Sequence, residues 1–217
     1  MGATGDAATF FDAFAERFDT LYDGQRNPVM RRIDQAFRAD MFIRFERTFE
    51  AFGDLTGRSV LDLGCGSGPY VIETFRRGAD TVTALDPAPA MLELVRQRLA
   101  ATEYAGRCMY LEGAFPDVAP PPHDHVIVMG VMDYIDEAAA FLTALRPLVR
   151  RSAAVSFPSQ HWFRTPLRKI RYRLRNCPVY FYNEPGIRAL CTDAGFAGVD
   201  IYKIPGSGLD YHACLTP

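Results

Sequence analysis

A short apolar strand followed at once by a glycine-rich turn constrains this chain more than any other stretch. Residues 59–69 read Ser-Val-Leu-Asp-Leu-Gly-Cys-Gly-Ser-Gly-Pro. Val60, Leu61 and Leu63 are typical of a buried strand. The three glycines let the backbone turn sharply and approach a ligand closely, and Pro69 suits the first turn of a helix. The stretch therefore predicts a strand, a nucleotide-type loop and a helix in succession.

Two acidic residues narrow the choice of ligand for this loop. A dinucleotide fingerprint needs glycine at its first, third and sixth positions, but Pro69 occupies the sixth and the last glycine comes early, at Gly68. Asp62, at the end of the strand, would repel phosphates and favour an ammonium or sulfonium cation. Further on, a β-branched strand ends in Asp86, where an acid in a parallel sheet accepts hydrogen bonds from ribose hydroxyls. We therefore expect a cationic ligand that carries a ribose.

The motifs Asp62-Leu63-Gly64-Cys65-Gly66-Ser67-Gly68 and Leu85-Asp86-Pro87 together resemble those of the class I S-adenosylmethionine-dependent methyltransferases. The order of elements is similar to that of this family along nearly the whole chain. The resemblance implies an α/β fold with a doubly wound, mostly parallel, seven-stranded sheet of the Rossmann-like type. Strands expected at 199–204 and 209–215 are joined by a short turn, so one strand of this C-terminal hairpin must run antiparallel to the rest.

The resemblance implies S-adenosylmethionine as cofactor, with S-adenosylhomocysteine as its product. The three glycines would let the loop backbone approach the methionine part, Asp62 would organise its charged amino-acid end, and Asp86 would hold the ribose. Ala114 stands where the family commonly has an acid beside the adenine, which leaves the adenine amino group to backbone or water, while the ring of Phe115 would pack against the adenine. The expected cofactor contacts are Tyr22, Asp62, Gly64, Cys65, Gly66, Gly68, Asp86, Pro87, Met91, Ala114, Phe115, Met129 and Gly130.

Two of these contacts also have a plainer interpretation. Tyr22 ends an aromatic helix expected over residues 10–22, which would either cap the cofactor pocket or simply cover the core. Met91 lies on the apolar stripe of a helix that begins near Pro89, and core packing is the favoured role for such a stripe.

The residues after the fourth expected strand, from Gly130 to Tyr134, would face cofactor and acceptor together, because ligands of open α/β sheets bind outside the carboxyl ends of the strands. If the acceptor is a hydroxyl group, Tyr134, Asp133 or His161 would take its proton, whereas a carboxylate or amine acceptor needs no base. Packing and helix capping are the alternative roles for Asp133 and Tyr134. Catalysis would mainly require an acceptor held dry and in line with the methyl group.

Residues 158–183 form the least regular part of the chain, and we expect them to be a lid over the acceptor site. Six cations between Arg164 and Arg175 would attract a carboxylate or phosphate, although a solvated basic helix face is the alternative interpretation. The segment Phe163–Arg168 is distantly similar to the lid region of magnesium-protoporphyrin O-methyltransferases, whose substrate is an anionic planar macrocycle. An anionic or aromatic acceptor is therefore expected.

Length and composition favour a single domain over residues 1–217, with residues 1–52 as an N-terminal helical cap. The formal net charge of −2 implies no bulk attraction to nucleic acid or to an anionic membrane. No apolar run approaches the roughly 18 residues of a membrane span, and the start lacks a signal-peptide pattern, so we expect a cytoplasmic protein. The sequence indicates no oligomeric state.

Neither the cysteines nor the histidines predict a metal site. The five cysteines are scattered and odd in number, and they lack paired ligand spacing, which favours reduced thiols. His123 and His125 flank one acid after a run of three prolines, and we interpret them as part of a solvated loop rather than as metal ligands.

The sequence is compatible with three functions. The first is a methyltransferase that acts on a small, anionic or aromatic acceptor by O- or N-methylation. The second is a non-catalytic module that binds cofactor or a partner on the same fold, although the intact set of acids and glycines argues against a decayed site. The third is a nicotinamide oxidoreductase, which the proline at the sixth fingerprint position disfavours.

Overall fold

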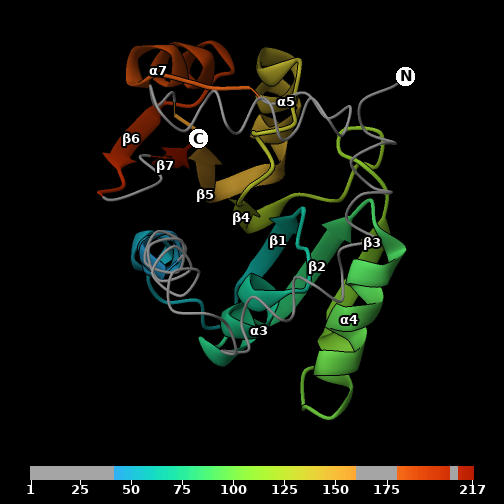
Figure 1. The fold of residues 1–217 in the computed structure, drawn as a ribbon. Helices are drawn as coiled ribbons and strands as arrows, with labels where there is room; N and C mark the ends of the chain where they lie inside the picture. The colour runs from blue at the N-terminus through green and yellow to red at the C-terminus, as the bar shows by residue number, and fades with distance from the viewer. Residues whose placement is uncertain (1–41, 160–179, 206–209) are drawn as a thin grey trace, which may run out of the picture.

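The computed structural model describes residues 42–159, 180–205 and 210–217. In these ranges the strands form one sheet, and helices connect most of the strands (Figure 1). The elements in chain order are a helix over residues 42–52, β1 (Ser59–Leu63), α3 (Pro69–Arg76), β2 (Thr81–Asp86), α4 (Pro89–Ala100), β3 (Cys108–Glu112), β4 (His123–Val128), α5 (Ala138–Leu145), β5 (Val149–Phe157), α7 (Glu184–Asp193), β6 (Gly198–Lys203) and β7 (Tyr211–Thr216). Single 3₁₀ turns precede β3 and β5.

The helices begin at the residues that the sequence signals indicate. Pro69 opens α3 and Pro89 opens α4, at positions where a missing N–H costs no intrahelical hydrogen bond. Asn183 caps α7, because its side-chain oxygen accepts a hydrogen bond from the backbone N–H of Gly186 at 2.8 Å. In the described ranges, no helix combines the length and the apolar character needed to cross a membrane.

The seven strands lie in the order β3-β2-β1-β4-β5-β7-β6. The pairs β1–β2, β1–β4, β2–β3 and β4–β5 are parallel, whereas β7 is antiparallel to both of its neighbours, β5 and β6. The expected mostly parallel, seven-stranded sheet with one antiparallel strand in the C-terminal hairpin is confirmed. Because the sequence order reverses between β1 and β4, the strand ends there form the switch point at which open α/β sheets bind ligands.

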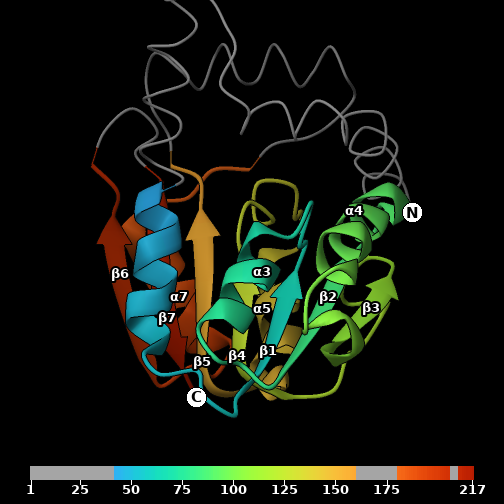
Figure 2. The same ribbon diagram turned by 90° about the horizontal axis from the view of Figure 1, so that it is seen from below.

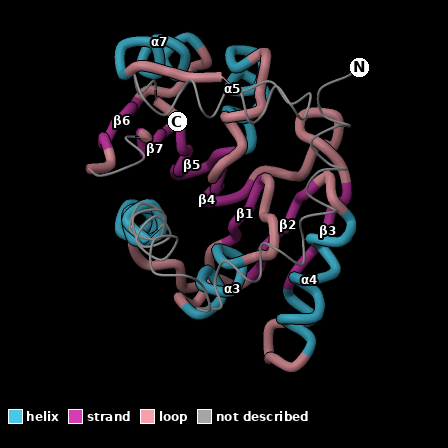
Figure 3. Tube along the Cα trace, viewed as in Figure 1, coloured by secondary structure: helices cyan, strands magenta, loops and turns pink. Residues whose placement is uncertain are grey.

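Helices cover both faces of the sheet, as the doubly wound class requires (Figures 2 and 3). On one face, helix 42–52, α3 and α4 contribute Phe49, Phe75 and Val95 to a core with the inward residues of β1 and β2. On the other face, α5 and α7 contribute Leu142 and Ile187 to a core shared with β4, β5 and β7. Both faces of the central strands are therefore buried under helices, which explains why the sequences of these strands are continuously apolar.

Two strands begin three or four residues before the position that the sequence predicts. The fourth strand begins at His123, so the interpretation of His123 and His125 as a solvated loop is wrong: both are buried, at 5% exposure each. Each ring is hydrogen-bonded within the sheet, His123 Nε2 to Thr83 Oγ1 at 2.9 Å and His125 Nδ1 to Ser152 Oγ at 2.8 Å. The fifth strand begins at Val149, four residues before the strand that the sequence predicts at 153–157.

Candidate functional site

The glycine loop leaves the end of β1 with three left-handed residues, Gly64, Gly66 and Gly68, at φ 71°, 52° and 80°. The backbone N–H of Gly64 donates to the Leu85 carbonyl at 2.8 Å, which ties the loop to the end of β2. The N–H of Gly68 donates to the Cys65 carbonyl at 3.0 Å and closes the turn before α3. Because residues with a side chain rarely adopt positive φ, the conformation of this loop requires glycine.

The three glycines differ in what surrounds them. A Cβ atom at Gly64 would lie 2.5 Å from Val131 Cγ2, and one at Gly68 would lie 2.7 Å from Val95 Cγ2. A Cβ atom at Gly66 would meet no atom within 4 Å. Gly64 and Gly68 therefore permit close packing, whereas Gly66 borders open space beside the ends of the strands.

Asp86 joins the glycine loop to the start of α4. Its Oδ2 accepts a hydrogen bond from the N–H of Gly66 and its Oδ1 accepts one from the N–H of Ala88, both at 2.9 Å. The residue is 6% exposed. Hydrogen bonds from N–H groups stabilise the ionised form of a carboxyl group, so these two bonds favour the carboxylate form of Asp86.

Asp62 lies on the same face of the sheet as Asp86, because its partner on β2 is Ala84, two residues before Asp86. It is 1% exposed, and its Oδ2 has no hydrogen-bond partner in the described part of the chain. Burial, followed by the charge of Asp86, raises the pKa of Asp62 to about 8. Burial and the same two acids raise the pKa of the neighbouring Cys65 thiol well above its usual value, so that thiol is neutral and unreactive.

The expected adenine contacts follow β3. Gly113 donates its N–H to the Asp86 carbonyl at 3.1 Å, which sets the turn that contains Ala114 and Phe115 beside the end of β2. The Phe115 ring packs edge to face on Phe141 of α5, with centroids 5.1 Å apart. Ala114 and Phe115 are both half-buried, so each retains a surface that a ligand can reach.

Met91, Met129 and Gly130 lie near the same strand ends. The Met91 side chain is 1% exposed and packs with Ala88, which agrees with its interpretation as a core residue. Met129 follows β4 and is half-buried, and Gly130 donates its N–H to Ser156 Oγ at 2.8 Å. Tyr22 and His161 lie outside the described residues.

The loop after β4 is fixed by the segment that precedes α7. The Tyr180 N–H donates to the Asp133 carbonyl at 2.9 Å, and the Tyr182 hydroxyl donates to the Met132 carbonyl at 3.3 Å. Asp133 is 6% exposed and Tyr134 is half-buried. Burial, followed by the charge of Asp133, raises the pKa of Tyr182 to about 12, so this hydroxyl serves as a hydrogen-bond donor rather than a base. Sequence reasoning missed this contact, because some fifty residues separate its two sides.

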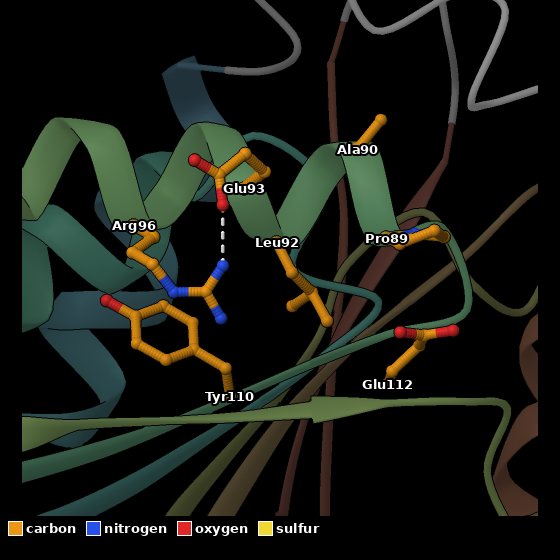
Figure 4. A pocket seen from close by; sticks show the side chains of 7 residues that line it. All are labelled: Pro89, Ala90, Leu92, Glu93, Arg96, Tyr110 and Glu112. Atoms are coloured by element: carbon orange, nitrogen blue, oxygen red, sulfur yellow. Dashed lines mark hydrogen bonds and ion pairs between the residues drawn. The ribbon is translucent and has the colours of Figure 1, made fainter.

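In the described part of the chain, one hollow lies toward each edge of the sheet. One, of about 490 Å³, lies between α4 and β3 and extends from Pro89 and Glu112 to Arg96, whose guanidinium stacks 4.6 Å from the centroid of the Tyr110 ring (Figure 4). The other, of about 120 Å³, lies at the ends of β5 and β6. It is lined by Ser159, Phe181, Tyr182, Asn183, Lys203 and Tyr211. Within the described ranges, no group of three or more His, Cys, Asp or Glu residues is placed to hold a metal ion.

Comparison with known proteins supports the class that this geometry suggests. Residues 60–152 match the family model described as a methyltransferase domain. Magnesium-protoporphyrin O-methyltransferase of Rhodobacter capsulatus is 38% identical over 81 residues, which cover 37% of this chain and 35% of that protein. Ubiquinone biosynthesis O-methyltransferase of Neisseria meningitidis is 32% identical over 111 residues, 50% of this chain and 46% of that protein. Relatives in this range also include a tRNA U34 carboxymethyltransferase.

The chain thus spans less than half the length of these curated relatives. Among solved structures, magnesium protoporphyrin IX methyltransferase of Synechocystis PCC 6803 with bound SAH superposes with a TM-score of 0.75 at 24% identity, covering 97% of both chains. The fold is therefore that of solved S-adenosylmethionine-dependent methyltransferases, and residues 60–152 match a methyltransferase domain. The matched stretch includes the glycine loop, Asp62 and Asp86.

Proposed function

We propose that this protein transfers a methyl group from S-adenosylmethionine to a small acceptor that is anionic or aromatic, by O- or N-methylation. The observation that carries the proposal is the pair Asp62 and Asp86, which ends two adjacent strands beside a loop whose Gly66 borders open space. The Asp62 Oδ2 atom is buried and has no partner among the described residues, which fits a cationic ligand. The Asp86 carboxylate is held in place by backbone N–H groups, and a carboxylate can also accept hydrogen bonds from ribose hydroxyls.

Each part of the cofactor has residues in this proposal that would hold it. Asp62 and the glycine loop would hold the methionine end, Asp86 the ribose, and Ala114 with Phe115 the adenine. Cys65, Pro87, Met129 and Gly130 would line the same site, while Met91 would support it from the core. When bound, the sulfonium supplies a methyl group that is already activated, and its transfer leaves S-adenosylhomocysteine.

The acceptor would enter beside Asp133 and Tyr134, from the side of the small hollow at the ends of β5 and β6. The Tyr180 N–H donates to the backbone carbonyl of Asp133 and so fixes the backbone there. The side-chain carboxylate of Asp133 would then accept the proton of a hydroxyl acceptor. Tyr134 and His161 are the other candidates for that proton. We also propose that residues 1–52 form a cap over the cofactor and residues 158–183 a lid over the acceptor.

Calorimetric titration with S-adenosylmethionine and, separately, S-adenosylhomocysteine tests the cofactor. Mass spectrometry of products from a panel of carboxylated and phenolic aromatic compounds, with transfer RNA as a further acceptor, tests the reaction. A product heavier by one methylene group identifies the acceptor class. Binding without turnover on any acceptor would favour the non-catalytic module instead, and binding of neither compound would contradict the proposed function.

A further inference from the structure

Asp62 and Asp86 are chemically unequal although they lie on one face of the sheet. Asp86 accepts N–H groups with both of its oxygens, from Gly66 and from Ala88. Asp62 is almost fully buried and has one oxygen without a partner in the described ranges. Two carboxyl groups in a dry site do not both ionise, and the one with fewer donors keeps the proton. The proton therefore belongs on Asp62.

The neighbouring elements supply Asp62 with no opposing charge among the described residues. The titratable groups that act on this cluster are Asp86 on β2, the Cys65 thiol in the glycine loop, and the Cys108 thiol and Tyr110 hydroxyl on β3. Burial raises the pKa of both thiols, so neither is charged at neutral pH. From α4, the Arg96 guanidinium acts on Cys108. Among the described residues, therefore, no cation offsets the burial of Asp62.

We propose that Asp62 is a proton-exchanging cation site, whose carboxyl group is protonated in the cofactor-free protein and releases that proton when a cationic group binds beside it. The inference rests on the proposed function, because the ammonium and sulfonium of S-adenosylmethionine are the cations in question. The balance is simple: one cationic group enters, one proton leaves to solvent, and the charge of the buried site is unchanged. The ionised Asp62 then pairs with the ligand, which removes the cost of a buried, uncompensated charge.

Proton release has a measurable signature in binding. Titration with S-adenosylmethionine at pH 6.5, where the ammonium of the ligand is itself fully charged, is repeated in phosphate, PIPES and imidazole. The slope of the observed enthalpy against buffer ionisation enthalpy gives the number of protons exchanged, and we expect the release of about one. The affinity should also rise about tenfold between pH 6 and pH 7, because one proton is released per ligand bound.

Matched variants separate this effect from a general change in charge. Asp62→Asn keeps the shape of the protonated side chain but cannot titrate, so proton release and the rise in affinity with pH should both disappear. Asp80→Asn makes the same substitution at an exposed position just before β2. This position is at the amino-terminal end of the strand, away from the site, so the variant should behave as the wild type. If Asp80→Asn also abolished proton release, the assignment to Asp62 would be overturned.

Infrared difference spectroscopy tests the protonated carboxyl group without any ligand. A protonated-carboxyl band should be present in the cofactor-free wild type at pH 6.5, absent from Asp62→Asn, and lost above about pH 8. Cofactor binding with no proton release, together with no such band, would overturn the inference while the proposed function stood. A band without cofactor binding would uphold the protonated carboxyl group and overturn the proposed function and the exchange with it.

Discussion

The carboxylate of Asp86 accepts the backbone N–H of Gly66 with Oδ2 and that of Ala88 with Oδ1, each at 2.9 Å. One side chain thus sets the distance between the glycine loop and the first turn of α4. Hydrogen bonds to a charged group contribute about 1.5–3 kcal/mol each, so the loss of this side chain affects both folding and binding.

Replacing Asp86 by Ala should weaken cofactor binding by about 100-fold or more, because the loop is released and the proposed ribose acceptor is lost. Calorimetric titration measures the affinity, and circular dichroism shows whether the variant is folded. Asp80→Asn, which removes one acid at an exposed position, is the control. Unchanged affinity in a folded Asp86→Ala variant would remove the ribose assignment.

Substitution of Gly66 by Ala should separate binding from folding. The new Cβ atom would meet no protein atom within 4 Å, so the cost to folding is only the strain of a positive φ, roughly 1 kcal/mol. The methyl group would occupy space next to the strand ends where we propose the cofactor to lie, and the affinity should fall more than tenfold. Gly57→Ala is a matched control, since it has φ +68° and no neighbours within 4 Å but lies before β1.

The Asp62→Asn variant should be more stable than the wild type in the cofactor-free state at pH 7. The pKa of Asp62 is raised in the folded state, so its penalty is absent below the unfolded pKa of 3.8 and grows as the pH rises toward about 8. We expect a gain of roughly 1–4 kcal/mol in the free energy of unfolding at pH 7. Urea denaturation at pH 5, 7 and 8 measures it, and a variant less stable than wild type at pH 8 would count against a neutral Asp62.

Two buried histidines act in the opposite direction at low pH. Burial lowers the pKa of His125 and of His212 to about 4, so the unfolded chain binds more protons than the folded one between pH 6.5 and pH 4. The stability they support is present above pH 6.5 and is lost as the pH falls, at a cost of about 2 kcal/mol each at pH 5.

This loss is best measured in the Asp62→Asn background, where the opposing titration of Asp62 is absent. Replacing His125 by Gln should reduce the slope of unfolding free energy against pH between pH 7 and pH 5, whatever its effect on absolute stability. His212 and His123, whose pKa burial also lowers, should account for the slope that remains. Urea denaturation across this range provides the slope. A slope equal to that of the parent would show that His125 is not a buried neutral group.

The sequence was most informative where one residue type serves one local purpose. The apolar run at Val60, the proline at Pro69 and the acid at Asp86 each mark the start or end of an element, and the structure has them there. His123 and His125 could not be placed in the same way, because a buried histidine needs hydroxyl partners. Those partners, Thr83 and Ser152, come from other strands, and their pairing is not encoded near the histidines.

For the candidate site, the sequence predicted which residues are present but not how they are hydrogen-bonded. The glycines and the two acids follow from local chemistry, but the unequal hydrogen bonding of Asp62 and Asp86 depends on the fold. The contact of Tyr182 with Met132 likewise arises only when the segment before α7 lies beside the loop after β4. Long-range packing therefore decides which of the predicted residues are charged, and which are held in place.

The position of β7 between β5 and β6 has a consequence for biosynthesis. On a ribosome β6 emerges before β7, yet in the finished sheet β6 pairs only with β7. Until Tyr211–Thr216 has emerged, the nascent chain exposes the edge of β5 and leaves β6 without a partner. Assembly of this half of the sheet therefore waits for β7, whereas β1, β2, β3 and β4 can pair before β7 is synthesised.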